Sequence, residues 1–168
     1  MSRMQTGRVA SINVSDDGVP KRSVPEAAIS ASGVAGDRQR DLRFHGGPER
    51  AVSLFGADVI EALAAEGHPI AAGTTGENLT IAGLRWSDVQ PGVELTVGPV
   101  RLLVTSYASP CSKIAASFAA DAFTRISPRM HPGWSRVYAR VLEPGLVRVG
   151  DPVRLGPARA PVNPPRPP

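Results

Sequence analysis

Apolar and polar side chains alternate in short runs along most of this chain. Residues 93–97, Val-Glu-Leu-Thr-Val, alternate strictly, which is typical of a strand with one buried face. Gly98-Pro99 then separates this run from residues 100–105, and the pattern predicts a hairpin. Turn-favouring residues bound the other extended runs. The predicted strands cover residues 7–14, 23–29, 50–55, 77–81, 93–97, 100–105, 137–141, 147–149 and 152–155.

Helical spacing of apolar residues appears twice. In residues 58–66, Val59, Ile60 and Leu63 fall on one face, and this predicts an amphipathic helix. Residues 112–122 are a weaker candidate, in which apolar side chains recur at every fourth position. Many short strands with one or two helices predict a mainly β fold, a closed or nearly closed β-barrel with short helical insertions.

Composition favours a single domain with a separate tail. The 168 residues include 17 Gly and 17 Pro, which excludes a long-helix bundle or a coiled coil. Five of the eleven residues in 158–168 are Pro, so we expect a disordered tail there and one domain over residues 1–157. The chain has neither a long apolar run nor an apolar N-terminal segment. We therefore expect no membrane span, no signal peptide and a cytoplasmic protein.

The charge balance is mildly basic. Nineteen Lys and Arg residues stand against 15 Asp and Glu residues, a formal net charge of +4. The basic residues are spread along the chain rather than gathered into a stripe, which argues against nucleic-acid binding. A modest excess of arginine still suits a small anionic ligand.

Cys111 is the single cysteine of the chain, so an internal disulfide and a zinc site built on several thiolates are excluded. It follows a predicted strand and precedes the weaker helix candidate, with Lys113 close by. A helix N-terminus and a nearby cation favour a thiolate, which is what a soft metal or a sulfur-transfer reaction needs. The alternative for a lone cysteine is a small buried packing residue.

Two further segments carry candidate binding residues. His45-Gly46-Gly47, close to Arg50, could form a nest of backbone N–H groups for an anion, or it could be a plain turn. Glu77 and Asn78 could contact a ligand, or they could simply form the turn that opens a strand.

Taken in chain order, six short motifs resemble the MOSC family, which is named for the C-terminal domain of molybdenum cofactor sulfurases. The resemblance covers roughly residues 5–156 and is strongest to stand-alone bacterial members. One departure is Ser106-Tyr107-Ala108-Ser109, where close relatives usually carry a Pro-Arg pair. The motifs are Gly36-Asp37-Arg38-Gln39, His45-Gly46-Gly47, Gly76-Glu77-Asn78-Leu79-Thr80, Pro110-Cys111-Ser112-Lys113, Tyr138-Ala139-Arg140-Val141-Leu142 and Gly145-Leu146-Val147-Arg148-Val149-Gly150-Asp151.

The resemblance implies a barrel of the kind shared with the pyruvate kinase barrel domain. It also implies that Cys111 is the family cysteine that ligates molybdenum or handles sulfur, with His45 as a second catalytic residue. By the same matching, a pocket for molybdenum cofactor (molybdopterin) would be lined by Gly46, Gly47, Arg50, Glu77, Asn78, Lys113 and Arg140.

Three functions are compatible with this resemblance. The first is a molybdenum-dependent enzyme that reduces N-hydroxylated bases or similar small molecules. It would need a separate electron donor, because the chain has no flavin, haem or iron–sulfur motif. The second is a sulfur carrier that accepts a persulfide on Cys111 from a pyridoxal-phosphate-dependent cysteine desulfurase. The third is a sensor or storage module that binds the cofactor without turnover.

Overall fold

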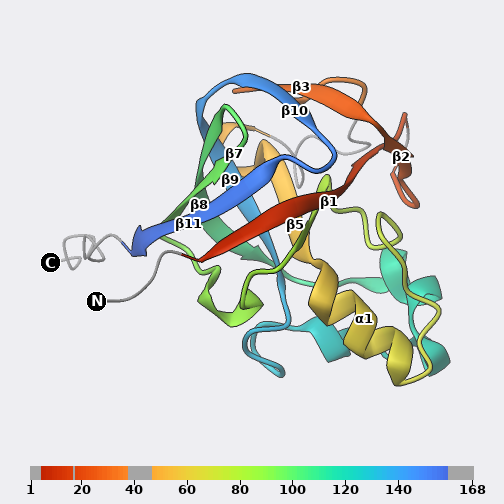
Figure 1. Cartoon of the computed structure of the whole chain (residues 1–168). Coiled ribbons are helices and arrows are strands. Elements are labelled where there is room, and N and C mark those ends of the chain that lie inside the picture. The colour runs from red at the N-terminus through yellow and green to blue at the C-terminus, as the bar shows by residue number, and fades with distance from the viewer. Residues whose placement is uncertain (1–4, 17, 38–46, 159–168) are drawn as a thin grey trace, which may run out of the picture.

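The computed structural model describes residues 5–16, 18–37 and 47–158, and a closed β-barrel is its central element (Figure 1). Seven of the strands in these ranges follow one another around the barrel, which closes where the last pairs with the first. All neighbours are antiparallel except β5 and β6, which are parallel. The predictions of a mainly β fold and of a barrel are confirmed. In spatial order the strands are β1 (Thr6–Val14), β11 (Pro152–Ala158), β7 (Val93–Val97), β8 (Val100–Ala108), β9 (Arg136–Glu143), β5 (Val52–Gly56) and β6 (Leu79–Ala82).

The alternation along each strand separates a packed interior from an outer face. Val52 pairs with Ala139 and Leu54 pairs with Val137 across β5 and β9, and all four side chains are fully buried in the core. Successive side chains of a strand point to opposite faces. Ser53 and the even-numbered residues at the start of β9 therefore lie outside the barrel. The candidate site described below is built on this outer face.

A second, smaller sheet packs on the barrel. It explains why the prediction of one continuous strand over residues 23–29 is wrong. The predicted strand 23–29 is two strands that belong to different sheets, separated at Pro25, which has no backbone N–H to donate to a ladder. The first half pairs with β1, whereas the second half is the middle strand of the small sheet. The strands concerned are β2 (Arg22–Val24), β3 (Glu26–Ser30), β4 (Gly33–Val34) and β10 (Gly145–Arg148).

The stronger helix prediction is confirmed and the weaker one is wrong. Helix α1 spans Ala57–Ala65 and buries Val59, Ile60 and Leu63, as its spacing predicts. The stretch 112–122 is instead broken into short 3₁₀ segments, because Phe118 adopts an extended conformation and two residues after it take positive φ. Their bounds are η3 (Ser112–Ser117), η4 (Ala119–Asp121) and η5 (Phe123–Ile126); η1 (Pro48–Arg50) and η2 (Trp86–Asp88) lie elsewhere in the chain.

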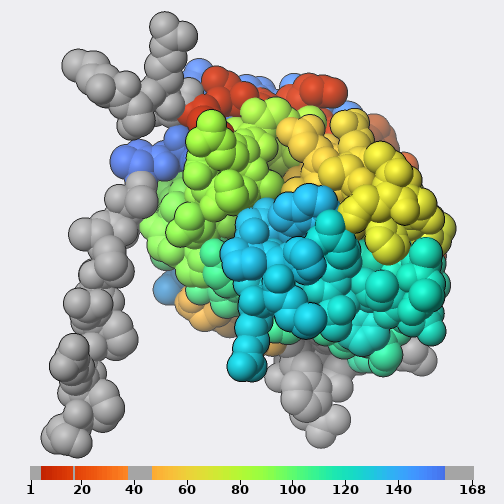
Figure 2. All heavy atoms as spheres, turned by 90° about the horizontal axis from the view of Figure 1, so that it is seen from below, coloured from red at the N-terminus to blue at the C-terminus, as the bar shows by residue number. Residues whose placement is uncertain are grey.

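Contacts with α1 account for the broken helix. Segments η3 to η5 lie beside α1 on one side of the molecule, where Figure 2 shows the two in yellow and teal. The Ala119 N–H donates to His68 Nδ1 at 3.0 Å, and the Phe118 ring meets the His68 ring edge-on. Arg125 forms an ion pair with Glu66 at 2.8 Å. The two contacts with His68 fall within residues 112–122 and outweigh the weak local preference of that stretch for an α-helix, whereas the Arg125 ion pair holds η5.

The last strand, β11, extends one residue beyond the expected domain boundary at 157, as far as the last described residue. The backbone of Ala158 is the last of β11 and pairs with Val93, and the rest of the predicted tail lies outside the described residues. The predicted loop 32–49 contains β4 and part of η1, and its residues 38–46 also lie outside the description. Within the described ranges, no helix is both long and apolar enough to cross a membrane.

Candidate functional site

Cys111 lies on the surface of the protein, three residues beyond the end of β8. Its side chain is exposed, and its backbone is extended (φ −140°, ψ 173°). The alternative of a buried packing residue is therefore wrong. The expected α-helix N-terminus is wrong as well, because the six-residue 3₁₀ helix η3 follows, and it gives no aligned α-helical dipole. Lys113 is exposed two residues further on. A ligand or a partner protein can thus reach the thiol from solvent.

Arg136 ties the cysteine segment to the rest of the fold. It is the first residue of β9 and pairs with Ala108, the last residue of β8. Its Nη1 donates to the Thr75 carbonyl oxygen at 2.6 Å, and its Nη2 donates to the Ser109 carbonyl oxygen at 3.3 Å. The guanidinium therefore bridges two loops, and its buried Nε–H group has no acceptor among the described residues.

The guanidinium of Arg136 is also a partly buried positive charge, and its Nε atom is fully enclosed. Burial lowers the pKa of Arg136 below its ordinary value, and the neighbouring Tyr138, Glu77 and Cys111 act in the opposite direction. A desolvated cation favours a negative group in its surroundings. Cys111 is thus placed within the field of a cation that its position in the sequence does not reveal.

Two further arginines, Arg50 and Arg140, lie along the same outer face of β9. The Arg50 guanidinium stacks over the Tyr138 ring, 5.2 Å from its centroid, and Arg140 forms an ion pair with Glu49 at 3.2 Å. Thr105 on β8 donates its hydroxyl to the Glu49 carbonyl oxygen, which fastens η1 to the strands. The backbone of η1 therefore lies against β8 and β9 and places Arg50 over the Tyr138 ring.

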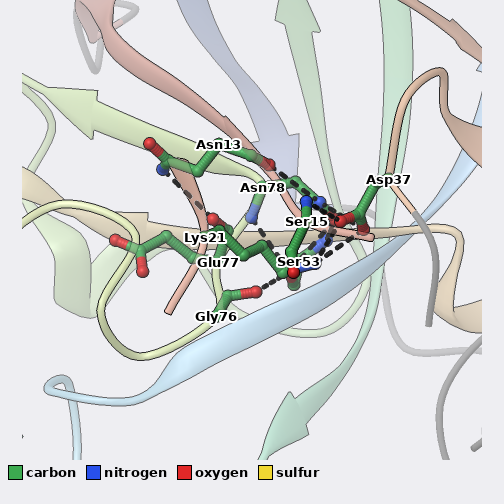
Figure 3. A network of polar contacts seen from close by, with 8 residues as sticks. All are labelled: Asn13, Ser15, Lys21, Asp37, Ser53, Gly76, Glu77 and Asn78. Atoms are coloured by element: carbon green, nitrogen blue, oxygen red, sulfur yellow. Dashed lines mark hydrogen bonds and ion pairs between the residues drawn. The ribbon is translucent and has the colours of Figure 1, made fainter. Parts of the chain in front are cut away.

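Asn78 is the centre of a buried polar network that joins four segments (Figure 3). Its Oδ1 accepts hydrogen bonds from the backbone N–H and the hydroxyl of Ser53, and its Nδ2 donates to the Asn13 carbonyl oxygen and to the Asp37 carboxylate. Asp37 also accepts from Lys21 Nζ at 2.6 Å, in an ion pair that is almost completely buried. The network thereby fixes the position of Asp37, the last described residue before 38–46.

Glu77 lies beside this network, but its carboxylate points away from Asp37 (Figure 3). The side chain is fully buried and accepts hydrogen bonds from the hydroxyls of Thr75 and Thr80 at 3.0 and 3.1 Å. Burial raises the pKa of the Glu77 carboxyl above its ordinary value of 4.5, although these hydroxyls and backbone N–H groups oppose the rise. Both Glu77 and Asn78 are therefore internal supports of the turn before β6, with their polar atoms already engaged.

The structure brings some of the expected residues together. Arg50 and Arg140 share the outer face of β9, and Arg136 connects that face to the segment of Cys111. Gly47 is exposed, with φ 81°, and directly precedes η1. His45 and Gly46 lie outside the described residues.

Sequence reasoning missed Arg136, Tyr138 and the anchoring role of Asp37. The alternation of β9 does place Arg136 and Tyr138 on the outward face, opposite Val137 and Ala139. This alternation shows on which face of the sheet a side chain lies. It gives no information on the loops that the side chain touches, because Thr75 and Ser109 are remote in the sequence.

Comparison with known proteins identifies related chains. The family model described as MOSC domain matches residues 41–154. Protein YflK of Bacillus subtilis (strain 168) is 31% identical over 145 residues, which are 83% of this chain and 63% of YflK. Protein YiiM of Escherichia coli (strain K12) is 29% identical over 135 residues, 77% of this chain and 59% of YiiM. The chain thus spans about three-fifths of the length of these curated relatives.

Solved structures share the fold. YiiM from Geobacillus stearothermophilus superposes with a TM-score of 0.69 at 25% identity, over 90% of this chain and 75% of that one. YuaD protein from Bacillus subtilis superposes with a TM-score of 0.70 at 18% identity, over 92% of this chain and 98% of that one. The second likeness concerns the fold alone.

Replacing Asn78 with Asp tests the buried network. Asn78→Asp puts a carboxylate oxygen where an N–H now donates to Asp37, so two buried acceptors would face each other. We expect a loss of about 3 kcal/mol in the free energy of unfolding at pH 7, measured by urea titration. The same amide-to-carboxylate change at the exposed Gln90, Gln90→Glu, should stay within about 0.5 kcal/mol of wild type. Equal effects of the two substitutions would contradict the role of Asn78.

Replacing Glu77 with Gln tests the buried carboxyl. Burial raises the pKa of the Glu77 carboxyl in the folded state. As pH rises, this carboxyl therefore loses its proton at a lower pH in the unfolded chain than in the folded protein. Its contribution to stability is therefore present below the ordinary value of 4.5 and is lost as pH rises through the raised pKa. Urea titrations from pH 4 to 8 should show that Glu77→Gln becomes more stable relative to wild type with rising pH. Glu61→Gln, at an exposed position on α1, is the control, and a parallel course for both variants would refute the assignment.

Proposed function

This chain belongs to the MOSC domain family, and on that basis we propose that it binds molybdenum cofactor through Cys111. The observation that carries the proposal is the exposed thiol of Cys111 on a segment that Arg136 holds through the Ser109 carbonyl oxygen. A thiolate is a soft ligand suited to such a metal. The adjacent cation stabilises negative charge at this place.

The residues around Cys111 fit an anionic, metal-bearing group. Arg136 Nε is a buried donor that lacks an acceptor among the described residues. Buried polar groups in native proteins are rarely left without a partner, so a bound anionic group is one that this donor could serve. Arg50 and Lys113 add positive charge that suits the phosphate of a pterin cofactor. Glu77 and Asn78 contribute differently from the first expectation, because their side chains support the turn before β6 from inside.

The enzymatic form of this proposal is the reduction of N-hydroxylated bases or similar small molecules. When bound, the cofactor supplies oxygen-atom transfer chemistry, with electrons from a separate donor protein. In this form Cys111 holds the group, whereas Arg50 and Lys113 orient its anionic part. The arrangement leaves the thiol side open for a small-molecule substrate, because Cys111 is exposed. Arg136 remains behind the cysteine segment and stabilises negative charge.

Exposure of Cys111 also favours a second function, that of a sulfur carrier. In that reaction the Cys111 thiolate attacks the outer sulfur of a persulfide on a cysteine desulfurase. A new S–S bond forms on Cys111, the S–S bond of the donor breaks, and the donor cysteine leaves as a thiolate. The exchange is redox-neutral overall. It requires only that the partner reach the thiol, and the same nearby cation would stabilise the anionic persulfide.

Replacing Cys111 with Ser separates these functions from a structural role. Cys111→Ser removes the soft sulfur with nearly the same volume, and we expect a loss of at least tenfold in molybdenum per chain. Because the residue is exposed, the free energy of unfolding should change by less than about 0.5 kcal/mol. Elemental analysis of protein made in a host with intact cofactor synthesis measures the first, and urea titration the second.

The adjacent Ser112→Ala is the matched control and should keep its molybdenum. A Cys111→Ser variant that retains molybdenum would overturn the metal-ligand role. Wild-type protein that carries labile sulfane sulfur on Cys111, with no molybdenum, would support the carrier function instead.

A further inference from the structure

The segment that carries Cys111 has few attachments of its own. Strand β8 ends at Ala108, and η3 begins at Ser112. Pro110 has no N–H group to donate. Among the residues that the structure describes, two hydrogen bonds hold the intervening residues: Ile114 N donates to the Cys111 carbonyl oxygen at 3.1 Å, and Arg136 Nη2 donates to the Ser109 carbonyl oxygen at 3.3 Å. The first bond lies within the segment's own turn, so Arg136 supplies the attachment to the barrel.

The other arm of Arg136 reaches a rigid part of the fold. Nη1 donates to the carbonyl oxygen of Thr75, a residue with no exposed surface. The Thr75 hydroxyl donates to Glu77, and the Thr80 hydroxyl donates to the other oxygen of the same carboxylate. Asn13 in turn donates to Thr80. A chain of hydrogen bonds therefore runs from β1 to the segment of Cys111. Its bonds are buried as far as Thr75, and Arg136 links Thr75 to the more exposed Ser109.

The cost of this arrangement points to a role beyond packing. A partly buried guanidinium whose hydrogen bonds go to neutral carbonyls gives up hydration without the compensation of an ion pair. Arg136 makes its two hydrogen bonds to backbone carbonyls, and its Nε has no acceptor among the described residues. The planar fork of arginine presents several donors in one fixed plane, which allows one side chain to hold two carbonyls in a defined relation.

We propose that Arg136 is a positioning residue that fixes the Ser109–Cys111 segment against the buried Thr75–Glu77 turn. The thiol of Cys111 then occupies one place before any ligand arrives. Binding therefore does not cost the conformational entropy of ordering the segment. This inference rests on the proposed function of Cys111. It adds a residue from β9 that acts through the cysteine segment, by its hydrogen bond to the Ser109 carbonyl oxygen.

The test compares Arg136→Met with Arg101→Met. Arg101 lies on the neighbouring strand β8 and also has two partners, Glu94 and Glu143, so it controls for the loss of a two-partner arginine from the sheet. In cofactor-free protein, amide hydrogen exchange in residues 111–117 should become about tenfold faster in Arg136→Met. Exchange in residues 93–104 should remain within twofold of wild type, and Arg101→Met should leave residues 111–117 unchanged. If Arg136→Met does not fold, Arg136→Gln, which keeps one amide donor, takes its place.

Two measurements on loaded protein complete the test. Molybdenum per folded chain should fall about fivefold in the Arg136 variant, and the paramagnetic resonance signal of the remaining molybdenum(V) should change shape. A purely structural residue would reduce the signal and leave its shape unaltered. Unchanged exchange in residues 111–117 would overturn the proposal, and so would faster exchange with an unaltered signal shape. If wild-type protein binds no molybdenum, the proposed function fails, while the exchange measurement still decides whether Arg136 holds the segment.

Discussion

The buried side chain of Asn78 is the contact on which the arrangement of this molecule depends. A primary amide has donors on one end and an acceptor on the other, and here each end is used twice, with Ser53 on one side and with Asn13 and Asp37 on the other. Because unsatisfied buried polar groups are costly, these partners can occupy only one relative arrangement. Strands β1, β5 and β6 and the residue preceding 38–46 are thereby locked together.

The candidate site is assembled on the outside of the barrel from this fixed frame. The barrel interior is filled by apolar side chains of β5 and β9 such as Leu54 and Val137, and the candidate binding residues Arg136 and Arg140 lie on the outward face of β9. The turn that contains Thr75 receives one arm of Arg136, and the other arm holds Ser109. Cys111 is consequently an exposed residue on a segment whose position is determined by buried contacts. That combination of access and fixed placement is what ligation of a metal or transfer of sulfur requires.

The sequence predicts the local features well and the remote contacts poorly. The strict alternation of 93–97 and the Gly98-Pro99 turn lead directly to the β7–β8 hairpin, because pairing there involves only neighbours in the chain. Residues 112–122 have helical spacing, yet they form short 3₁₀ segments, with Phe118 and Ala119 in contact with His68. Cys111 is identified by its uniqueness, whereas the contacts of Arg136 with Thr75 and Ser109 join residues 61 and 27 positions apart. Contacts of that kind follow from strand order, which local patterns do not contain.

The central claim is that Cys111 is the attachment point of a molybdenum-bearing cofactor. The most direct measurement is a crystal structure of the protein isolated from a host with intact cofactor synthesis, with anomalous diffraction recorded on both sides of the molybdenum absorption edge. The account predicts a single strong anomalous peak within bonding distance of Cys111 Sγ, with Arg136 still bonded to the Ser109 carbonyl oxygen. A molybdenum peak elsewhere on the molecule, with Cys111 unliganded, would contradict it.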